Sequence, residues 1–249
     1  MKRFDRQPSA PYTVEVTFRD RLIGTLRALR PILEEPGVLV VGSEVPNLLE
    51  PGAASTLVVS QDVDLGLPLD RLESVKQRLR GVNGLVPSAE EPSVYVPTSP
   101  SLIEANFLGL DSRIREASET YVFEDAELPL MVFGPLGLLR PGPVIDIDGL
   151  RVPLPRPADL MAEKLLSDRT GEKGARDLLV VAGLLATATA TDLDELVSVA
   201  RGLSPESGHA ICSNLTVLSL MEPRAGMPNP MPFRLQVKRL LARIEKQNA

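Results

Sequence analysis

The stretch GSEVPNLLEPGAASTLVVSQDVDL, residues 42–65, decides how the rest of the chain is interpreted. It follows the apolar run Val38–Val41 and ends in two aspartates, Asp62 and Asp64, separated by one valine. A continuous apolar run bounded by turn residues predicts a buried strand. Alternate side chains of a strand share a face, so we expect Asp62 and Asp64 to point toward one site. Two like charges this close favour a cation between them, and Mg²⁺ prefers oxygen ligands.

The beginning of this stretch predicts a place for an anion. Ser43–Leu49 is expected to form a short helix, whose first turn exposes backbone N–H groups beside the Ser43 hydroxyl. Pro51–Gly52 predicts a loop, and Thr56–Leu65 predicts the strand that carries the two aspartates. Metal and phosphate are therefore expected to meet at this site.

Composition excludes several classes of protein. Of the 249 residues, 43% are hydrophobic and 24% charged, as in an ordinary globular chain. No apolar run approaches the roughly 20 residues of a membrane span, so we expect no membrane contact and a cytoplasmic location. Cys212 and His209 are the sole residues of their types, which excludes an internal disulfide, a thiolate zinc cluster and a histidine-rich metal site.

Charge and aromatic content limit how nucleic acid can be bound. The net charge of −6 argues against a protein that coats nucleic acid, although it leaves room for a local basic groove. Aromatic residues make up 4% and tryptophan is absent, so recognition by stacked bases is not expected. The helix predicted over Phe233–Gln247 is basic and amphipathic, and either packs on the domain with a solvated face or contacts RNA phosphates.

The pattern of elements predicts two parts. Strands dominate before residue 155 and helices after it, so we expect an α/β catalytic domain with a mixed sheet over 1–155 and a helical domain over 156–249. Spacing predicts helices over Arg19–Leu33, Pro68–Leu79, Asp111–Ser118, Ala158–Leu166, Arg176–Ala188, Asp192–Gly202, Gly208–Leu220 and Phe233–Gln247. Further strands are predicted over Tyr12–Phe18 (or an ordered arm there), Val94–Val96, Leu102–Leu108, Tyr121–Phe123 and Leu128–Phe133, with loops over Val82–Pro92 and Gly134–Pro143.

A third acid lies within a predicted strand. Glu104 interrupts the apolar run Leu102–Leu108, and a buried carboxylate needs a partner. Neighbouring strands lie about 4.8 Å apart, so Glu104 can join Asp62 and Asp64, or else form a buried ion pair. Asp111 is its nearest rival.

A second aspartate pair, Asp146 and Asp148, is better explained by a hairpin that turns at Asp148–Gly149. His209 and Cys212 lie three residues apart on a predicted helix, without a recognisable nucleophile elbow, so nucleophilic catalysis by this pair is not expected.

Four ordered phrases carry a resemblance to a known family: GSEVPNLL, SQDVDL, LIEANFL and PADLMAEKLLSDRTGEKGARDLLVV. The chain resembles the nucleotidyltransferase fold of polymerase-beta-like enzymes. More narrowly, it is similar to the AbiEii-type toxins, which include the MenT-like tRNA nucleotidyltransferase toxins. The resemblance implies that Gly42 and Ser43 hold the triphosphate of an NTP and that Asp62 and Asp64 bind Mg²⁺. Glu104 would complete a second metal site or deprotonate the acceptor hydroxyl.

The resemblance also assigns residues in the helical part. Lys164 would neutralise phosphate charge and Asp177 would be the closing acid. Lys164 and Arg169 would bind the nucleotide. Arg169, Lys173 and Arg176 lie between Lys164 and Asp177, around a Gly171–Gly174 turn that would fold one helix back toward the other. An NTP would lose pyrophosphate as its nucleotide moves to an acceptor, which the resemblance implies is the 3′ end of tRNA, and a cognate antitoxin protein would be a partner.

Two other classes of function fit the same residues. The fold also modifies small molecules such as aminoglycosides, or hydroxyl side chains of a partner protein. A catalytically silent nucleotide-binding module would keep the fold without the chemistry.

Overall fold

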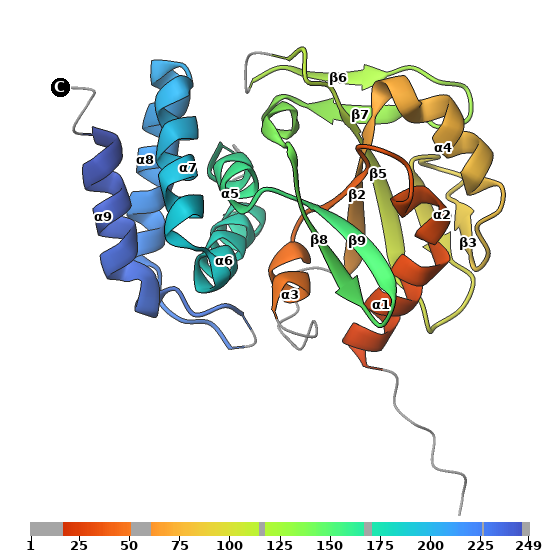
Figure 1. Ribbon diagram of the computed structural model, residues 1–249, viewed down its shortest axis with the longest axis horizontal. Coiled ribbons are helices and arrows are strands. Elements are labelled where there is room, and N and C mark those ends of the chain that lie inside the picture. The colour runs from red at the N-terminus through yellow and green to blue at the C-terminus, as the bar shows by residue number, and fades with distance from the viewer. Residues whose placement is uncertain (1–16, 51–60, 115–117, 167–170, 226, 246–249) are drawn as a thin grey trace, which may run out of the picture.

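A computed structural model describes residues 17–50, 61–114, 118–166, 171–225 and 227–245 (Figure 1). Most of the predicted Tyr12–Phe18 strand, the Pro51–Gly52 loop and the first part of the predicted Thr56–Leu65 strand lie outside the described residues. The described chain combines a mixed sheet with a helical C-terminal part, as the sequence pattern predicts.

The centre of the molecule is a seven-stranded mixed sheet in which β1, β2, β5, β4 and β3 are neighbours in that order. β2 pairs in parallel with β5, whose other edge is shared by antiparallel β4 and parallel β7, and β6 pairs with β7. The strands are β1 (Leu39–Val41), β2 (Asp62–Pro68), β3 (Leu85–Pro87), β4 (Val94–Pro97), β5 (Glu104–Leu110), β6 (Thr120–Phe123) and β7 (Leu130–Phe133).

Side chains of the two central strands, β2 and β5, alternate between a buried apolar face and a polar face of the sheet. In β2, Val63, Leu65 and Leu67 are buried, and in β5 Ala105 and Phe107 are buried. These residues belong to the same hydrophobic core as α1 (Phe18–Ala28), α2 (Arg30–Leu33) and α4 (Leu72–Leu79). Because the side-chain period of a strand is two, the intervening polar residues all reach the opposite face.

The first predicted helix is present but broken. α1 starts at a capping box formed by Thr17 and Asp20 and ends at Leu29, after which α2 begins. Pro31 lies in the first turn of α2, where its missing N–H costs nothing, but inside one continuous helix it would remove a hydrogen bond. Gly37, with φ +84°, then turns the chain into β1.

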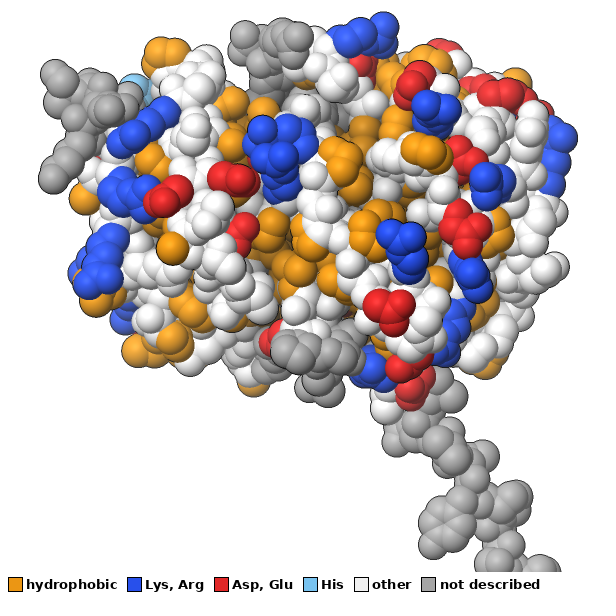
Figure 2. Space-filling view, viewed as in Figure 1, with side chains coloured by type: hydrophobic (Ala, Val, Ile, Leu, Met, Phe, Trp, Pro, Cys, Tyr) orange, Lys and Arg blue, Asp and Glu red, His pale blue; other side chains and the backbone are white. Residues whose placement is uncertain are grey.

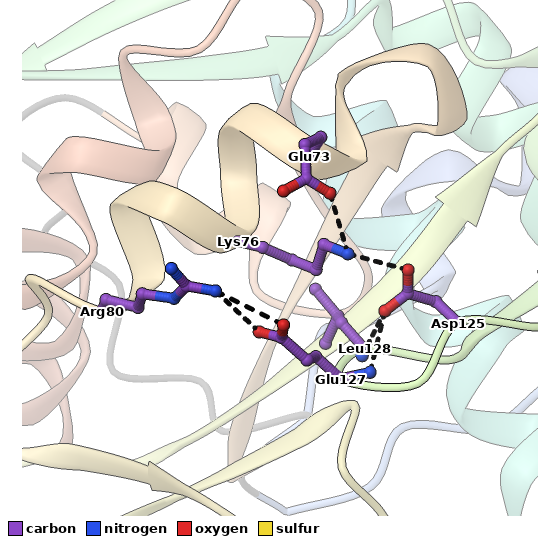
Figure 3. Close-up of polar contacts among 6 residues, drawn as sticks. All are labelled: Glu73, Lys76, Arg80, Asp125, Glu127 and Leu128. Atoms are coloured by element: carbon purple, nitrogen blue, oxygen red, sulfur yellow. Dashed lines mark hydrogen bonds and ion pairs between the residues drawn. The ribbon is translucent and has the colours of Figure 1, made fainter.

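A cluster of ion pairs ties α4 to the loop between β6 and β7 (Figure 3). Lys76 Nζ lies 2.9 Å from both Glu73 Oε2 and Asp125 Oδ2. Asp125 Oδ1 accepts hydrogen bonds from the backbone N–H groups of Glu127 and Leu128, and Glu127 pairs with Arg80. Asp125 Oδ1 therefore stabilises the conformation of its own loop, and Asp125 Oδ2 connects this loop to α4.

The predicted hairpin is confirmed by β8 (Pro141–Ile147) and β9 (Leu150–Pro155). Asp148 has φ 53° and Gly149 φ 79°, the left-handed pair that a tight hairpin turn requires. Asp146 Oδ1 accepts a hydrogen bond from Gly149 N, and Asp148 pairs with Arg27. The turn thus accounts for the second aspartate pair.

The C-terminal part is helical, as predicted. Its first helix, α5, begins two residues after β9 ends at Pro155. α5 and α6 lie between the sheet and α7–α9 (Figure 1). One connected hydrophobic core includes residues of the sheet and of all five helices. The helices are α5 (Pro157–Leu166), α6 (Gly171–Thr187), α7 (Ala190–Gly202), α8 (Pro205–Leu220) and α9 (Arg234–Glu245).

Several local predictions were wrong. Val82–Pro92 contains β3 rather than loop alone, and Gly134–Pro143 contains the 3₁₀ helix η3 (Gly134–Leu138) and the start of β8. Residues 111–114 form a turn instead of a helix, because Asp111 Oδ1 accepts a hydrogen bond from Arg113 N, the local competition that makes aspartate favour turns. Gly171–Gly174 is the first turn of α6, not a separate turn.

Short 3₁₀ helices complete the architecture, namely η2 (Leu69–Arg71), which precedes α4, and η4 (Met231–Phe233), which precedes α9. Within the described ranges, none of the helices has the length and apolar character needed to cross a bilayer.

We expect Thr25→Val to weaken the fold next to Glu104. Thr25 is fully buried in α1, and its Oγ1 accepts a hydrogen bond from Ile103 N at 2.8 Å. Valine keeps the volume but leaves that N–H unpaired, which should lower the free energy of unfolding by about 1–3 kcal/mol. Urea denaturation measures the change. Thr25→Ser keeps the hydroxyl and is the control; equal losses in both variants would show that the lost hydrogen bond is not the cause.

Candidate functional site

Strand register brings two of the predicted acids and one unpredicted amide together. β2 and β5 are aligned so that Asp62 lies beside Glu104 and Asp64 beside Asn106, all on the polar face of the sheet. Asn106 Nδ2 donates to Asp62 Oδ2 at 2.7 Å and to Asp64 Oδ1 at 3.1 Å. The side-chain amide therefore bridges the two carboxylates.

Gly42 makes room for this pair. It follows β1, in which Val41 is the register partner of Asp64, and it has φ +87°. A Cβ at residue 42 would overlap the Asp64 carboxylate, its nearest atom being Oδ2. Glycine is thus required at position 42 for two reasons: the backbone has a positive φ, and a side chain would overlap Asp64.

The predicted phosphate-binding helix differs from expectation. α3 (Val45–Leu49) begins two residues after Ser43, and its N-cap residue is Glu44. Glu44 is buried, makes no capping hydrogen bond with its side chain, and accepts a hydrogen bond from Asn47 Nδ2 at 2.6 Å. A short helix that begins with an acid is a poorer anion site than the sequence pattern predicts. Ser43 itself lies half-buried beside Gly42.

Lys164 supplies a positive charge from the helical part. It lies on α5 and is 6% exposed; its Nζ is 3.1 Å from Glu163 Oε2 and 3.7 Å from Asp177 Oδ1, on α6. Burial alone would lower the pKa of Lys164, but the charges of Glu163, Asp177 and Asp64 outweigh burial and raise it. Lys164 therefore stays protonated at neutral pH and joins α5, α6 and the acidic pair electrostatically.

The position of α5 is fixed by an ion pair between a buried aspartate and an exposed arginine. Asp159, in the first turn of α5, accepts two hydrogen bonds from the Arg140 guanidinium, at 2.9 and 2.6 Å. Asp159 is fully buried and also accepts a hydrogen bond from Arg140 N at 3.2 Å. Because Arg140 lies between η3 and β8, this two-pronged contact orients α5, and with it Lys164, relative to the sheet.

The electrostatics of the acidic pair are set mainly by burial. Burial, and then the charge of Asp62, raise the pKa of Asp64 to about 6, while the Asn106 hydrogen bond and Lys164 act in the opposite direction. Burial, followed by the charges of Asp62 and Glu91, also raises the pKa of Glu104. Both carboxyls therefore hold protons more tightly than exposed acids do.

The oxygen atoms at this site are of the kind that a hard cation prefers, but the three predicted acids are not grouped around one position. Within the described ranges, no three aspartate, glutamate, histidine or cysteine side chains are grouped to hold a metal ion, so Asp62, Asp64 and Glu104 do not form a ready three-carboxylate cluster. Asn106 Oδ1, however, is buried with no hydrogen-bond partner, and an unpaired buried acceptor costs about 1–3 kcal/mol. Two carboxylates and an amide oxygen are ligands that Mg²⁺ accepts.

A pocket of about 310 Å³ opens beside Lys164 in the helical part. Its walls come from α5, α6, α8 and the segment after α8, and they are largely small and apolar, with Asn214 and Arg224 as polar groups. Asn214 Nδ2 donates to the Leu165 carbonyl at 2.7 Å, so this side chain is fixed in place. The volume lies at the lower end of the range for small-molecule sites.

The other predicted residues lie elsewhere or are explained by structure. Arg169 lies outside the described residues, while Lys173 is exposed on α6 and Arg176 half-buried there. Asp111 follows the last residue of β5, at the far end from Glu104, and the hydrogen bond from Arg113 lowers its pKa, with a smaller contribution from Tyr121.

The two single-copy residues form no catalytic arrangement. His209 is exposed on α8, and burial raises the pKa of the Cys212 thiol, contrary to what a reactive thiolate needs.

The basic helix α9 is packed on its neighbours. Val237, Leu240 and Ile244 are buried, and Arg234 and Arg243 pair with Glu222 and Asp194. Lys238 and Arg239 are exposed. Figure 2 shows basic and acidic side chains interspersed over the visible face, without a continuous basic surface. The packing role of α9 is therefore observed, while RNA contact stays a prediction.

Sequence reasoning missed Asn106 and Glu163. Both had a signal: Asn106 follows Glu104 by two positions in LIEANFL and so shares its face, and Glu163 precedes Lys164. Every residue from Ala158 to Leu166 is buried, so each charge in this helix requires a partner.

No protein-family model matches this chain, and no curated protein matches it at a significant level.

We expect Gly42→Ala to destabilise the fold more than Gly149→Ala does. Both glycines have positive φ, +87° and +79°, but nothing lies within 4 Å of a Cβ at residue 149, whereas at residue 42 it would overlap Asp64. The left-handed conformation alone costs about 1–2 kcal/mol for a residue with a side chain. Urea denaturation should show an additional loss for Gly42→Ala; equal losses would mean that Asp64 moves aside without cost.

The raised pKa of Asp64 predicts a specific pH dependence. Above pH 6 the folded chain carries a buried carboxylate that the unfolded chain solvates, so ionisation opposes folding; below about pH 4 the carboxyl is protonated in both states and the penalty vanishes. Asp64→Asn should therefore raise the free energy of unfolding by roughly 2–3 kcal/mol at pH 7 and by much less at pH 4. Urea denaturation of both chains in EDTA measures this difference, and a gain independent of pH would contradict it.

Proposed function

We propose that this chain is a magnesium-dependent nucleotidyltransferase, which moves a nucleotide monophosphate from an NTP to an acceptor hydroxyl and releases pyrophosphate. The observation that carries the proposal is the partly buried pair Asp62 and Asp64, held on one face of the sheet, with Gly42 beside Asp64 and the ammonium of Lys164 near enough to influence Asp64. Like charges are concentrated in a buried site when a cation is to be bound there.

Each residue has a role that its surroundings allow. Asp62 and Asp64 would hold Mg²⁺, which when bound stabilises the charge that develops on the attacking and leaving oxygens. Lys164, kept protonated by its acidic neighbours, would attract the triphosphate. Gly42 packs against the Asp64 carboxylate and Ser43 follows it half-buried, so we assign the phosphates to Gly42 and Ser43 beside the cation. Asp177 holds Lys164 from α6.

Glu104 is the candidate base. It is partly exposed and in register with Asp62, and its pKa is raised, which suits a group that must accept a proton near neutral pH. The acceptor oxygen would attack the α-phosphorus, its proton would pass to Glu104, and the bond to pyrophosphate would break. The pocket of about 310 Å³ that Lys164 lines would receive part of the nucleotide.

For the acceptor we propose the 3′ end of tRNA, and for the physiological role that of a toxin with a protein antitoxin. Both proposals rest on the resemblance of the four sequence phrases to the AbiEii-type toxins. The exposed Lys238 and Arg239 of α9 are available for phosphate contacts, although the mixed charge of the surface limits how much RNA could be bound electrostatically.

The proposal predicts label transfer that requires Asp64. The intact chain is incubated with Mg²⁺, each α-labelled NTP in turn, total RNA and a mixture of hydroxyl-bearing small molecules. Label should appear in RNA of tRNA size, and Asp64→Asn should reduce transfer roughly a hundredfold or more, because a ligand and its charge are lost. The matched control is Asp70→Asn, at an aspartate whose side chain is 78% exposed, which should transfer at the original rate.

The position of the label separates the alternatives. Label in a small molecule or in protein would replace tRNA as acceptor and keep the enzyme class. No label with any nucleotide, together with no heat of Mg²⁺-NTP binding in calorimetry, would contradict the proposal.

A further inference from the structure

We infer that Asn106 binds the cation of this site through Oδ1, after a rotation of its side-chain amide. The third ligand is then an amide oxygen rather than the carboxylate of Glu104. This inference rests on the proposed function, because it requires that Asp62 and Asp64 bind a divalent cation.

The first observation is the way in which the amide is held. Asn106 Nδ2 contacts a carboxylate oxygen of both Asp62 and Asp64, so this NH₂ group occupies the space between them. The other end of the same amide, Oδ1, is buried and has no hydrogen-bond partner. The NH₂ end of the side chain is thus hydrogen-bonded to both carboxylates, whereas the carbonyl end has no hydrogen-bond partner.

The orientation of the Asn106 amide depends on whether a cation lies between the two carboxylates. Nδ2 is a donor and binds carboxylates in the absence of a cation, whereas a divalent cation between the carboxylates repels an N–H group and attracts a carbonyl oxygen. Rotation by half a turn about χ2 exchanges the two ends without moving the backbone, and this torsion of asparagine is soft. The unused acceptor then becomes a ligand.

The geometry favours Asn106 over Glu104 as the third ligand. Asn106 lies beside Asp64 and contacts both carboxylates directly. Glu104 lies two residues before Asn106, at the start of β5 and beside Asp62, and the described acids do not form a group of three around a metal position. Glu104 is therefore left available to accept a proton, and the two residues have separate roles.

The test compares cation affinity in four full-length chains at pH 8, with Mn²⁺ as the probe and electron paramagnetic resonance to count the free ion. Asn106→Asp replaces the amide with a carboxylate of the same shape and should tighten Mn²⁺ binding about tenfold, because a charged ligand is added. Asn106→Leu removes the ligand and should weaken binding about tenfold or more. Glu104→Gln should change the affinity by less than about twofold, because its carboxylate is not a ligand.

A second measurement detects the rotation itself and needs no variant that alters packing. In a chain with ¹⁵N-labelled asparagine, the side-chain NH₂ signal that disappears in Asn106→Asp belongs to Asn106. Diamagnetic Mg²⁺ should shift this signal and speed the exchange of its protons with water, because both hydrogen bonds to carboxylates are lost. An unchanged Asn106 signal at saturating Mg²⁺ would overturn the rotation.

The outcomes separate this inference from the proposed function. If the unmodified chain binds Mn²⁺ and transfers nucleotides, but Glu104→Gln weakens binding while Asn106→Leu does not, Glu104 is the third ligand and only the inference fails. If the unmodified chain neither binds Mn²⁺ nor transfers nucleotides, the proposed function fails and the inference with it. Loss of affinity in Asn106→Leu with a gain in Asn106→Asp supports both.

Discussion

The repulsion between Asp62 and Asp64 is the constraint to which the surrounding structure responds. Two partly buried carboxylates on one strand face repel each other, and burial, followed by the charge of Asp62, raises the pKa of Asp64. Two neighbours relieve the repulsion: the Asn106 amide donates to both carboxylates, and Lys164 contributes a positive charge. Gly42, which has no side chain, leaves room for the Asp64 carboxylate.

The helical part contributes to the site through a single buried helix. α5 is fixed at its first turn by the contact of Asp159 with Arg140, and it presents Lys164 at its last turn. Glu163 and Asp177 lie on either side of the ammonium in contact distance, so two carboxylates balance the charge of this buried group. Because one core runs through the sheet and the helices, the two parts share their packing and do not form separate globules.

Much of the fold follows from patterns that are local in sequence. The apolar run before Gly42, the Asp148–Gly149 turn and the spacing of α5 through α9 predict elements that the structure contains. The errors occur where a side chain competes with the local pattern, as Asp111 does when it binds Arg113 N, or where a strand as short as β3 lacks a periodic signal. The site was partly predictable, since Asp62, Asp64 and Lys164 do come together. The spacing of Asn106 from Glu104 places both on one strand face, but the bridge from Asn106 to the two aspartates depends on the register between β2 and β5, which the sequence pattern does not specify.

The parallel pairing of β2 with β5 also has a consequence for how the chain reaches its folded state. Asn106 and Asp62 are separated by 44 positions, and a parallel pair cannot form through a short hairpin. Contacts of this kind require closure of a long loop before they contribute stability, so they form late and slow the folding reaction. During synthesis the two aspartates therefore emerge before the amide that bridges them, and the bridge forms only when β5 pairs with β2.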